Sequence, residues 1–256
     1  MPADDRRRPG RGWRRRPHWL AALLVVAGAM AGAGCRSAAG PALDAAALAD
    51  AREALSAPLS GDLAALYHLR VPSSGALRLA VLAVGADGRM TISEPFGGAV
   101  SVTAWAAGQP TRVYDLRDGC WRGGAAAAAG LGVTAMPLPQ AVRLLGGRLP
   151  AVAGDRVVER ADGRIEITGD AWGALVTVAP EPWRVTAVDE LTPTGEPGWR
   201  VLLRGHSGSV PGTVRIDGAQ RGWAELELVR LEWDGGNGLP DEPRLPPCGA
   251  LAGAPP

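Results

Sequence analysis

The stretch Leu-Arg-Leu-Ala-Val at residues 77–81 places an aliphatic side chain at every second position. Successive side chains of a β-strand point to opposite faces of its sheet, so this alternation predicts a strand with one buried face. The same period returns at 224–229, where Ala224, Leu226 and Leu228 alternate with two glutamates and a valine. Strands of this kind decide the fold class.

Further strand patterns lie between these two stretches, separated by turn-forming clusters of Gly, Pro and Asp such as 85–88 and 95–98. The predicted strands start near Leu66 and then cover 77–81, 90–93, 100–104, 111–116, 157–160, 164–168, 174–178, 184–188, 199–204, 212–216 and 224–232. This series, with one helical insertion, predicts an α+β fold. Helices would pack against or plug the concave face of a single strongly curved antiparallel sheet.

Two segments have helical patterns. Residues 44–55 begin with an aspartate suited to cap a helix, and Leu48 and Leu55 lie seven positions apart on one face. Residues 136–149 carry prolines near their start and two glycines near their end, which suit the entry and exit of an apolar helix. The alanine run at 125–129 fits either a helix or a mobile loop, and both interpretations stay open.

The first 34 residues have the three parts of a secretory signal peptide. Seven arginines lie among residues 6–16, an uncharged apolar stretch covers 19–27, and small residues then lead to Cys35. A membrane-spanning helix needs about 20 apolar residues, so we prefer a signal that is removed. Cys35 resembles the acylated cysteine of a bacterial lipobox. An uncleaved anchor with a buried cysteine is the alternative, and the arginine pair at 15–16 leaves the export route open.

After the signal we expect an acylated tether at 35–43, one domain at 44–240 and an irregular tail rich in Gly and Pro at 241–256. All 27 basic residues are arginines, and 26 residues are acidic. Seven arginines and two aspartates lie in the signal, which leaves 20 basic and 24 acidic residues and a net charge of −4. A mildly acidic chain argues against nucleic acid as a partner.

The chain has three cysteines. If Cys35 is acylated, Cys120 and Cys248 remain as an even pair in a compartment that permits disulfides. A bridge between them would tie the C-terminal tail to the middle of the domain. Two free, half-buried thiols are equally consistent with the sequence.

Several short motifs occur in order along the chain: Cys35, Pro95-Phe96-Gly97, Leu144-Leu145-Gly146, Gly198-Trp199-Arg200-Val201, and Pro211 with Val214-Arg215-Ile216. Together they resemble the LolA and LolB group of periplasmic lipoprotein-sorting proteins, especially its lipid-anchored LolB-like branch. The resemblance implies an unclosed β-barrel with a helical lid, which encloses an apolar cavity for acyl chains.

The resemblance also implies a membrane-insertion loop at Phe96, which stands between Pro95 and two glycines and would project toward the membrane interface. A core position for Phe96 is the alternative. The residues expected to line the apolar interior are Leu77, Leu79, Val81, Val100, Val102, Leu144, Leu145, Trp199, Leu226 and Leu228. Their alternation alone is equally consistent with a filled core.

We predict no catalytic residues, no metal site and no cofactor. The Gly-His-Ser-Gly-Ser sequence at 205–209 is similar to a nucleophile elbow, but a strand pattern follows where a helix is required, so we predict a hairpin turn. Residues 130–135 imitate a dinucleotide-binding loop without its flanking strand and helix. His68 and His206 have no Cys or carboxylate partners at ligand spacing.

Two functional hypotheses follow. The first is a non-enzymatic protein, lipid-anchored on the periplasmic face of the outer membrane, that holds acyl chains of a lipoprotein or lipid and passes them to that membrane. A periplasmic carrier protein is then a candidate partner. Arg36 stands where Asp would resemble an inner-membrane retention signal. The alternative is a structural or sensing envelope lipoprotein that binds a protein partner and encloses no ligand.

Overall fold

The structure is a computed structural model that describes residues 43–72, 75–123, 136–170, 172–192, 198–218, 222–234 and 238–248. It contains the helices α2 (Ala45–Ser56) and α4 (Leu138–Leu145). The strands are β1 (Leu63–Val71), β2 (Gly75–Val84), β3 (Asp87–Ser93), β4 (Ala99–Trp105), β5 (Arg112–Asp115), β6 (Cys120–Gly123), β7 (Arg156–Glu159), β8 (Ile165–Thr168), β9 (Gly173–Ala179), β10 (Arg184–Glu190), β11 (Trp199–Arg204), β12 (Thr213–Gly218) and β13 (Gly222–Trp233).

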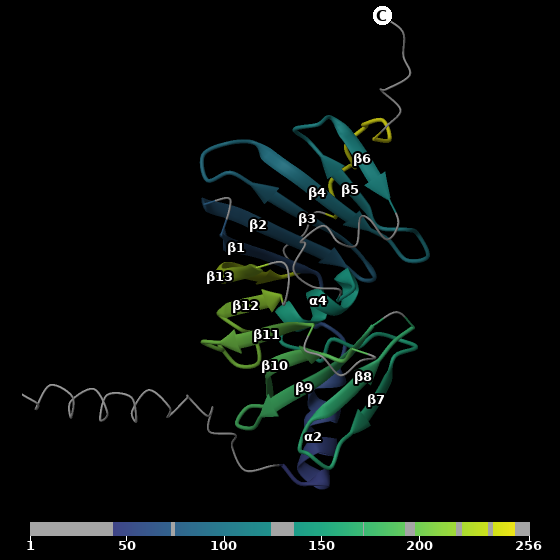
Figure 1. Cartoon of the computed structure of the whole chain (residues 1–256), viewed down its shortest axis with the longest axis vertical. Coiled ribbons are helices and arrows are strands. Elements are labelled where there is room, and N and C mark those ends of the chain that lie inside the picture. Colours follow the sequence, from purple (N-terminus) through teal and green to yellow (C-terminus); the bar gives the residue numbers. More distant parts are fainter. Residues whose placement is uncertain are drawn as a thin grey trace, which may run out of the picture. The chain divides into compact units, whose positions relative to one another are not determined.

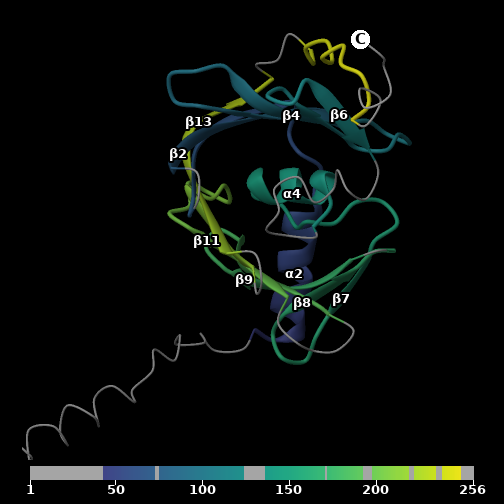
Figure 2. The same ribbon diagram turned by 45° about the horizontal axis from the view of Figure 1, so that its top comes forward.

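These strands form one 13-stranded sheet in the order β6-β5-β4-β3-β2-β1-β13-β12-β11-β10-β9-β8-β7, and every neighbouring pair is antiparallel. The pairing of β1 with β13 joins the first half of the chain to the second. The edge strands β6 and β7 leave the sheet unclosed. Figures 1 and 2 show that the sheet curves around α2 and α4. The predicted α+β fold, an unclosed β-barrel with a helical lid, is confirmed.

Local chemistry explains both helices. The Asp44 carboxylate accepts a hydrogen bond from the Ala47 amide at 2.8 Å and caps α2, as predicted. The second helix is shorter than the predicted range 136–149. Pro137 precedes it, and Gly147 has a φ of +76°, which ends it soon after Leu145 because this conformation favours glycine.

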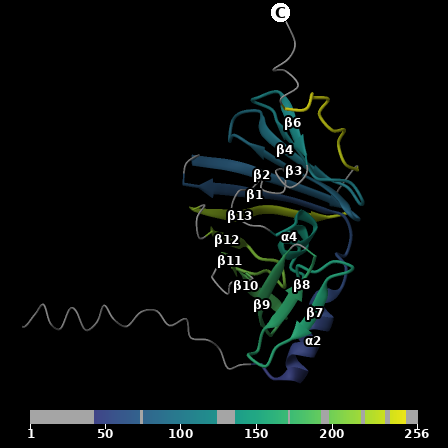
Figure 3. The same ribbon diagram turned by 45° about the vertical axis from the view of Figure 1, so that its right-hand side comes forward.

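The concave face of the sheet and the two helices share one apolar core. Leu48 and Leu55 of α2 are fully buried there, as their spacing predicted, together with Val142 of α4. Figure 3 shows α2 beside β7, where Arg52 forms an ion pair with Glu159 at 3.0 Å. Burial of one apolar face is the main stabilisation of a strand or helix of this length, so this core positions the lid on the sheet.

A second, smaller core lies on the opposite face of the same sheet. It contains Val102, Ala104 and Tyr114, with Leu116, Trp121 and Leu245 packed against them. The strand register explains the separation: Val102 is opposite Thr91, whereas Leu79 is opposite Ile92 on the concave face. The prediction that Val102 shares an interior with Leu79 is therefore wrong. Val100 lies on the same strand beside a register shift and is half-buried.

Candidate functional site

The predicted interior positions fall into two groups. Six of them are buried in the main core: Leu79, Val81, Leu144, Leu145, Trp199 and Leu226. Leu77 and Leu228 are half-buried and pack against it. The main core thus brings strands from both halves of the chain against α4, whereas Val102 lies on the other face of the sheet. The result is an apolar interior bounded by the sheet and the helical lid.

The lid is held by backbone carbonyls at the C-terminal end of α2 and by one that follows α4. Arg143 of α4 donates hydrogen bonds to the carbonyls of Ser56 at 3.0 Å, Ala57 at 3.2 Å and Leu149 at 3.1 Å. Burial, and the nearby charge of Arg148, lower the pKa of Arg143 below its ordinary value. Sequence analysis did not identify this residue, since an arginine on an apolar helix gives no signal of its partners.

Phe96 lies in the turn between β3 and β4 and is fully exposed. The turn is held by a hydrogen bond from the Gly97 amide to the Glu94 carbonyl at 3.4 Å. Glu94 also pairs with Arg117 of the β5–β6 turn at 2.5 Å. Phe96 therefore projects, and the alternative of a core position is excluded. Whether it enters a membrane stays a prediction.

We call the end of the sheet that carries Phe96 the Phe96 rim. Because all strand pairs are antiparallel, β3 ends and β4, β7, β9 and β11 begin at this rim. Leu191, which follows β10, is also exposed here. Two of the three exposed large apolar side chains among the described residues thus lie on one rim.

A polar group interrupts the apolar interior near the same rim. Gln140 of α4 is 5% exposed and is the only amide or charged side chain that is buried in the described residues. Its amide donates to the Asp155 carboxylate at 3.2 Å, and the same carboxylate oxygen accepts from the Val152 amide at 2.9 Å. Asp155 directly precedes β7, and Trp172 directly precedes β9. No sequence motif marks this group, because its members come from three separate elements.

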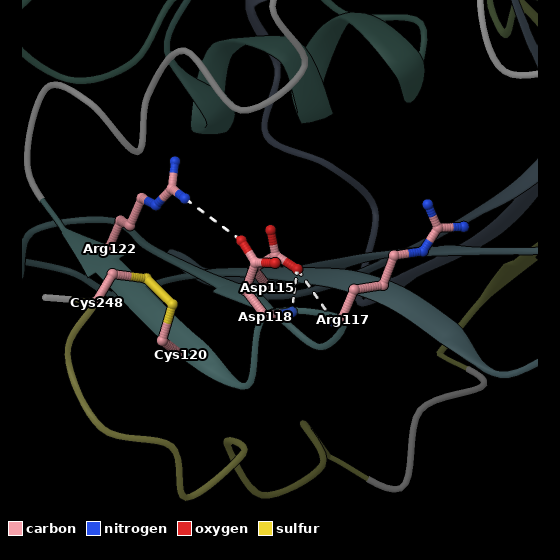
Figure 4. The surroundings of a disulfide bond; sticks show 6 residues. All are labelled: Asp115, Arg117, Asp118, Cys120, Arg122 and Cys248. Atoms are coloured by element: carbon pink, nitrogen blue, oxygen red, sulfur yellow. Dashed lines mark hydrogen bonds and ion pairs between the residues drawn. A yellow bond between two sulfur atoms is a disulfide. The ribbon is translucent and has the colours of Figure 1, made fainter. Parts of the chain in front are cut away.

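The tail is attached to β6, which the sequence did not predict as a strand. Cys120 and Cys248 form a disulfide, and the Trp121 amide donates to the Pro246 carbonyl at 2.9 Å. Figure 4 shows the bridge beside the β5–β6 turn, where one Asp115 carboxylate oxygen accepts from the backbone amides of Arg117 and Asp118, each at 3.0 Å. The disulfide interpretation of the two cysteines therefore matches the structure.

The 205–209 segment is a hairpin turn between β11 and β12, as predicted, closed by the Ser207–Val210 bridge. His206 hydrogen-bonds the Val185 carbonyl through Nε2 at 2.8 Å. The pKa of His206 lies below its ordinary value, mainly because the ring is partly buried. Within the described ranges, no three His, Cys, Asp or Glu side chains are grouped to hold a metal ion.

Several predictions fall outside the described residues. They include the signal peptide, Cys35 with most of its tether, the alanine run at 125–129 and the Gly-rich segment at 130–135. None of the helices in the described part is long and apolar enough to span a membrane.

The comparisons with known proteins rest on structure alone. No protein-family model matches the chain, and no curated protein matches it. A LolA superfamily protein from Nitrosomonas europaea is similar with a TM-score of 0.51 and 13% identity, over 78% of this chain and 96% of that one. A DUF1329 family protein from Desulfovibrio piger has a TM-score of 0.51 and 12% identity, over 74% and 91%.

A third solved structure, a putative outer membrane lipoprotein-sorting protein domain from Vibrio parahaemolyticus, has a TM-score of 0.48 and 13% identity, over 74% of this chain and 92% of that one. At 13% and 12% identity, the two matches with a TM-score of 0.51 show the fold alone. The chain has a LolA/LolB-like fold.

Proposed function

We propose that this protein is a non-enzymatic, lipid-anchored carrier that holds acyl chains in its apolar interior and passes a lipoprotein or lipid to the outer membrane. The observation that supports this most is the concave apolar face of a LolA/LolB-like sheet, covered by α2 and α4. Acyl chains leave water by the same apolar contacts that bury leucine and valine. The side chains that would meet them are Leu77, Leu79, Val81, Leu144, Leu145, Trp199, Leu226 and Leu228.

The anchor in this proposal is Cys35, acylated after removal of residues 1–34. A single acyl chain gives only marginal membrane binding, and a diacylated cysteine supplies the second chain that stable anchoring needs. Arg36 following Cys35 favours outer-membrane residence on the periplasmic side. A periplasmic carrier protein would deliver the cargo.

Native mass spectrometry of protein purified without detergent tests the carrier proposal. Residues 36–256, expressed without the anchor in the periplasm, are expected to carry lipid masses that organic extraction removes. A spectrum with only the mass of the bare chain, unchanged after incubation with lipid vesicles, would refute the proposal.

One observation favours the second candidate, a structural or sensing lipoprotein. Leu48, Leu55 and Leu149 are almost fully buried, so the protein's own side chains fill part of the space between α2 and the sheet. An interior filled along its whole length would have no room for an acyl chain. The spectrum of bare protein described above is the result expected for this candidate.

Phe96→Glu tests the role of the exposed loop. Phe96 makes no contribution to either core, so the variant should keep its fold and its bound lipid. A charge at the membrane interface opposes insertion, and transfer of lipid to acceptor vesicles should slow by about tenfold or more. The measurement is transfer of a fluorescent phospholipid analogue from loaded protein to liposomes.

Phe96→Leu is the matched control, because it keeps an apolar tip of smaller size. It should transfer lipid at nearly the rate of the unchanged protein. Equal rates for the Glu and Leu variants, with equal amounts of bound lipid, would rule out the insertion role of this residue.

A further inference from the structure

The polar group at the Phe96 rim has hydrogen-bonding capacity that the protein does not use. Gln140 donates to Asp155, but the Gln140 carbonyl oxygen Oε1 is buried without a hydrogen-bond partner in the described chain. The indole nitrogen of Trp172 is likewise buried without a partner. An unpaired buried polar atom destabilises the protein, so each of these atoms favours a ligand group that pairs with it.

The Asp155 carboxylate lies between these two side chains and has one oxygen to spare. Its Oδ2 accepts hydrogen bonds from the Gln140 side-chain amide and from the Val152 backbone amide. No hydrogen bond within the described residues reaches Oδ1. Oδ1 is therefore a negatively charged acceptor that is held in place by the bonds to its neighbour oxygen.

The backbone at Gly169 comes close to both Asp155 and Trp172. A Cβ on Gly169 would lie 2.5 Å from the Trp172 indole nitrogen and 2.6 Å from Asp155 Oδ1. Any larger residue would collide with both atoms. Trp172 also packs against the main core, so this small polar site borders the apolar interior.

We propose that Gln140, Asp155 and Trp172 form a head-group site that selects an amphiphile with an uncharged polar end, a hydroxyl or a primary amide. Such a group donates to Gln140 Oε1 or Asp155 Oδ1 and accepts from the Trp172 indole N–H. Its alkyl chain extends into the interior, so this inference rests on the proposed carrier function.

A carboxylate or phosphate head group does not suit the same site. It could accept from Trp172, but it has no proton for Gln140 Oε1, and it would meet the Asp155 charge at close range in a partly buried setting. The site therefore selects by charge and by hydrogen-bond direction together.

Displacement of the uncharged probe N-phenyl-1-naphthylamine tests the selection. The competitors are 1-dodecanol, dodecanamide and dodecanoate at pH 8, which share one chain length and differ in head group. Protein without the anchor should bind the alcohol and the amide at least about tenfold more tightly than dodecanoate.

Asp155→Asn is the decisive variant. Its side-chain oxygen can replace Oδ2 and keep both internal hydrogen bonds, while its amide replaces Oδ1 and turns an anionic acceptor into a neutral donor. The preference for the alcohol over dodecanoate should fall by about tenfold. Asp162→Asn is the matched control, because Asp162 carries the same charge in the β7–β8 turn at the other end of these strands. It should leave the preference unchanged.

Trp172→Phe provides a second test that keeps an aromatic six-membered ring and removes the five-membered ring that carries the N–H donor. It should weaken binding of dodecanol and dodecanamide by about fivefold or more. A selectivity that neither Asp155→Asn nor Trp172→Phe alters would overturn the head-group site while leaving the carrier function intact. If no 12-carbon competitor displaces the probe, the carrier function and the head-group site both fail.

Discussion

At the scale of single residues, the two tyrosines of the chain have opposite surroundings. Tyr67 is fully buried, and its hydroxyl has no hydrogen-bond partner within the described residues. The Tyr114 hydroxyl donates to the Glu242 carboxylate. We expect Tyr67→Phe to raise the free energy of unfolding by about 1 kcal/mol and Tyr114→Phe to lower it by about 1–2 kcal/mol. Urea unfolding of both variants measures the difference, and two changes of the same sign would contradict it.

Tyr67 also makes the stability of the protein depend on pH. Burial raises the pKa of Tyr67, so the folded protein keeps its proton at pH values where the unfolded chain loses it. The unfolded chain ionises at about pH 10, and above that pH the equilibrium shifts toward the unfolded state. Stability measured between about pH 9 and 11 should therefore decline less steeply in Tyr67→Phe than in the unchanged protein.

At the scale of elements, Arg143 decides how α4 is attached to the C-terminal end of α2. Arg143→Met keeps the aliphatic length and removes hydrogen bonds to three carbonyls, so the free energy of unfolding should fall by about 2–3 kcal/mol. Hydrogen exchange of the α4 amides should become faster. Arg148→Met is the control, because the Arg148 side chain donates only to the Ala54 carbonyl among the described contacts, and the change should cost about 1 kcal/mol or less.

The C-terminal tail is a covering element attached by the disulfide. Cys120 and Cys248 are 128 residues apart, so their bridge removes much freedom from the unfolded chain. The Cys120→Ala/Cys248→Ala double variant should lose about 2–5 kcal/mol of stability and bind more of a dye that reports exposed apolar surface. The protein without substitutions should lose the same stability when its disulfide is reduced. Normal stability in the double variant would show that the tail is held by its other contacts.

The tail also makes polar and apolar contacts with the sheet. Arg89 donates to the Asp241 carbonyl at 3.0 Å, Arg112 pairs with Glu242 at 3.0 Å, and Leu245 packs on the smaller core. Without the tail, Trp121 and Val102 would lose part of their cover. The described part of the tail, residues 238–248, contains no helix or strand, and it protects the face of the sheet on which Val102 lies.

At the scale of the whole molecule, the strand alternation and turn residues were sufficient to predict one antiparallel sheet. Residues 77–81 and 224–229 became the central strands β2 and β13, on either side of β1. The strand β6 was missed, because Cys120–Gly123 lies at the start of a Gly- and Ala-rich stretch. This segment forms a strand because it pairs with β5, and its own composition does not predict that contact.

The candidate site was predictable only in part. Phe96 could be predicted to project because a turn rich in Pro and Gly offers a large apolar side chain little to pack against. Val102 could not be assigned to a face, because both faces of β4 carry apolar side chains and both are covered. Gln140, Asp155 and Trp172 are 15 and 17 positions apart in the chain and come together only when α4 packs beside the starts of β7 and β9.

The sequence by itself determined most of the strands, the capped helix α2 and the projecting turn, since each depends on side-chain period or backbone conformation over a few residues. Only the tertiary structure decided which face of each strand is concave, where the tail lies and which polar atoms remain unpaired. Those properties depend on the curvature of a 13-stranded sheet and on contacts between distant residues. Local patterns carry no information on either.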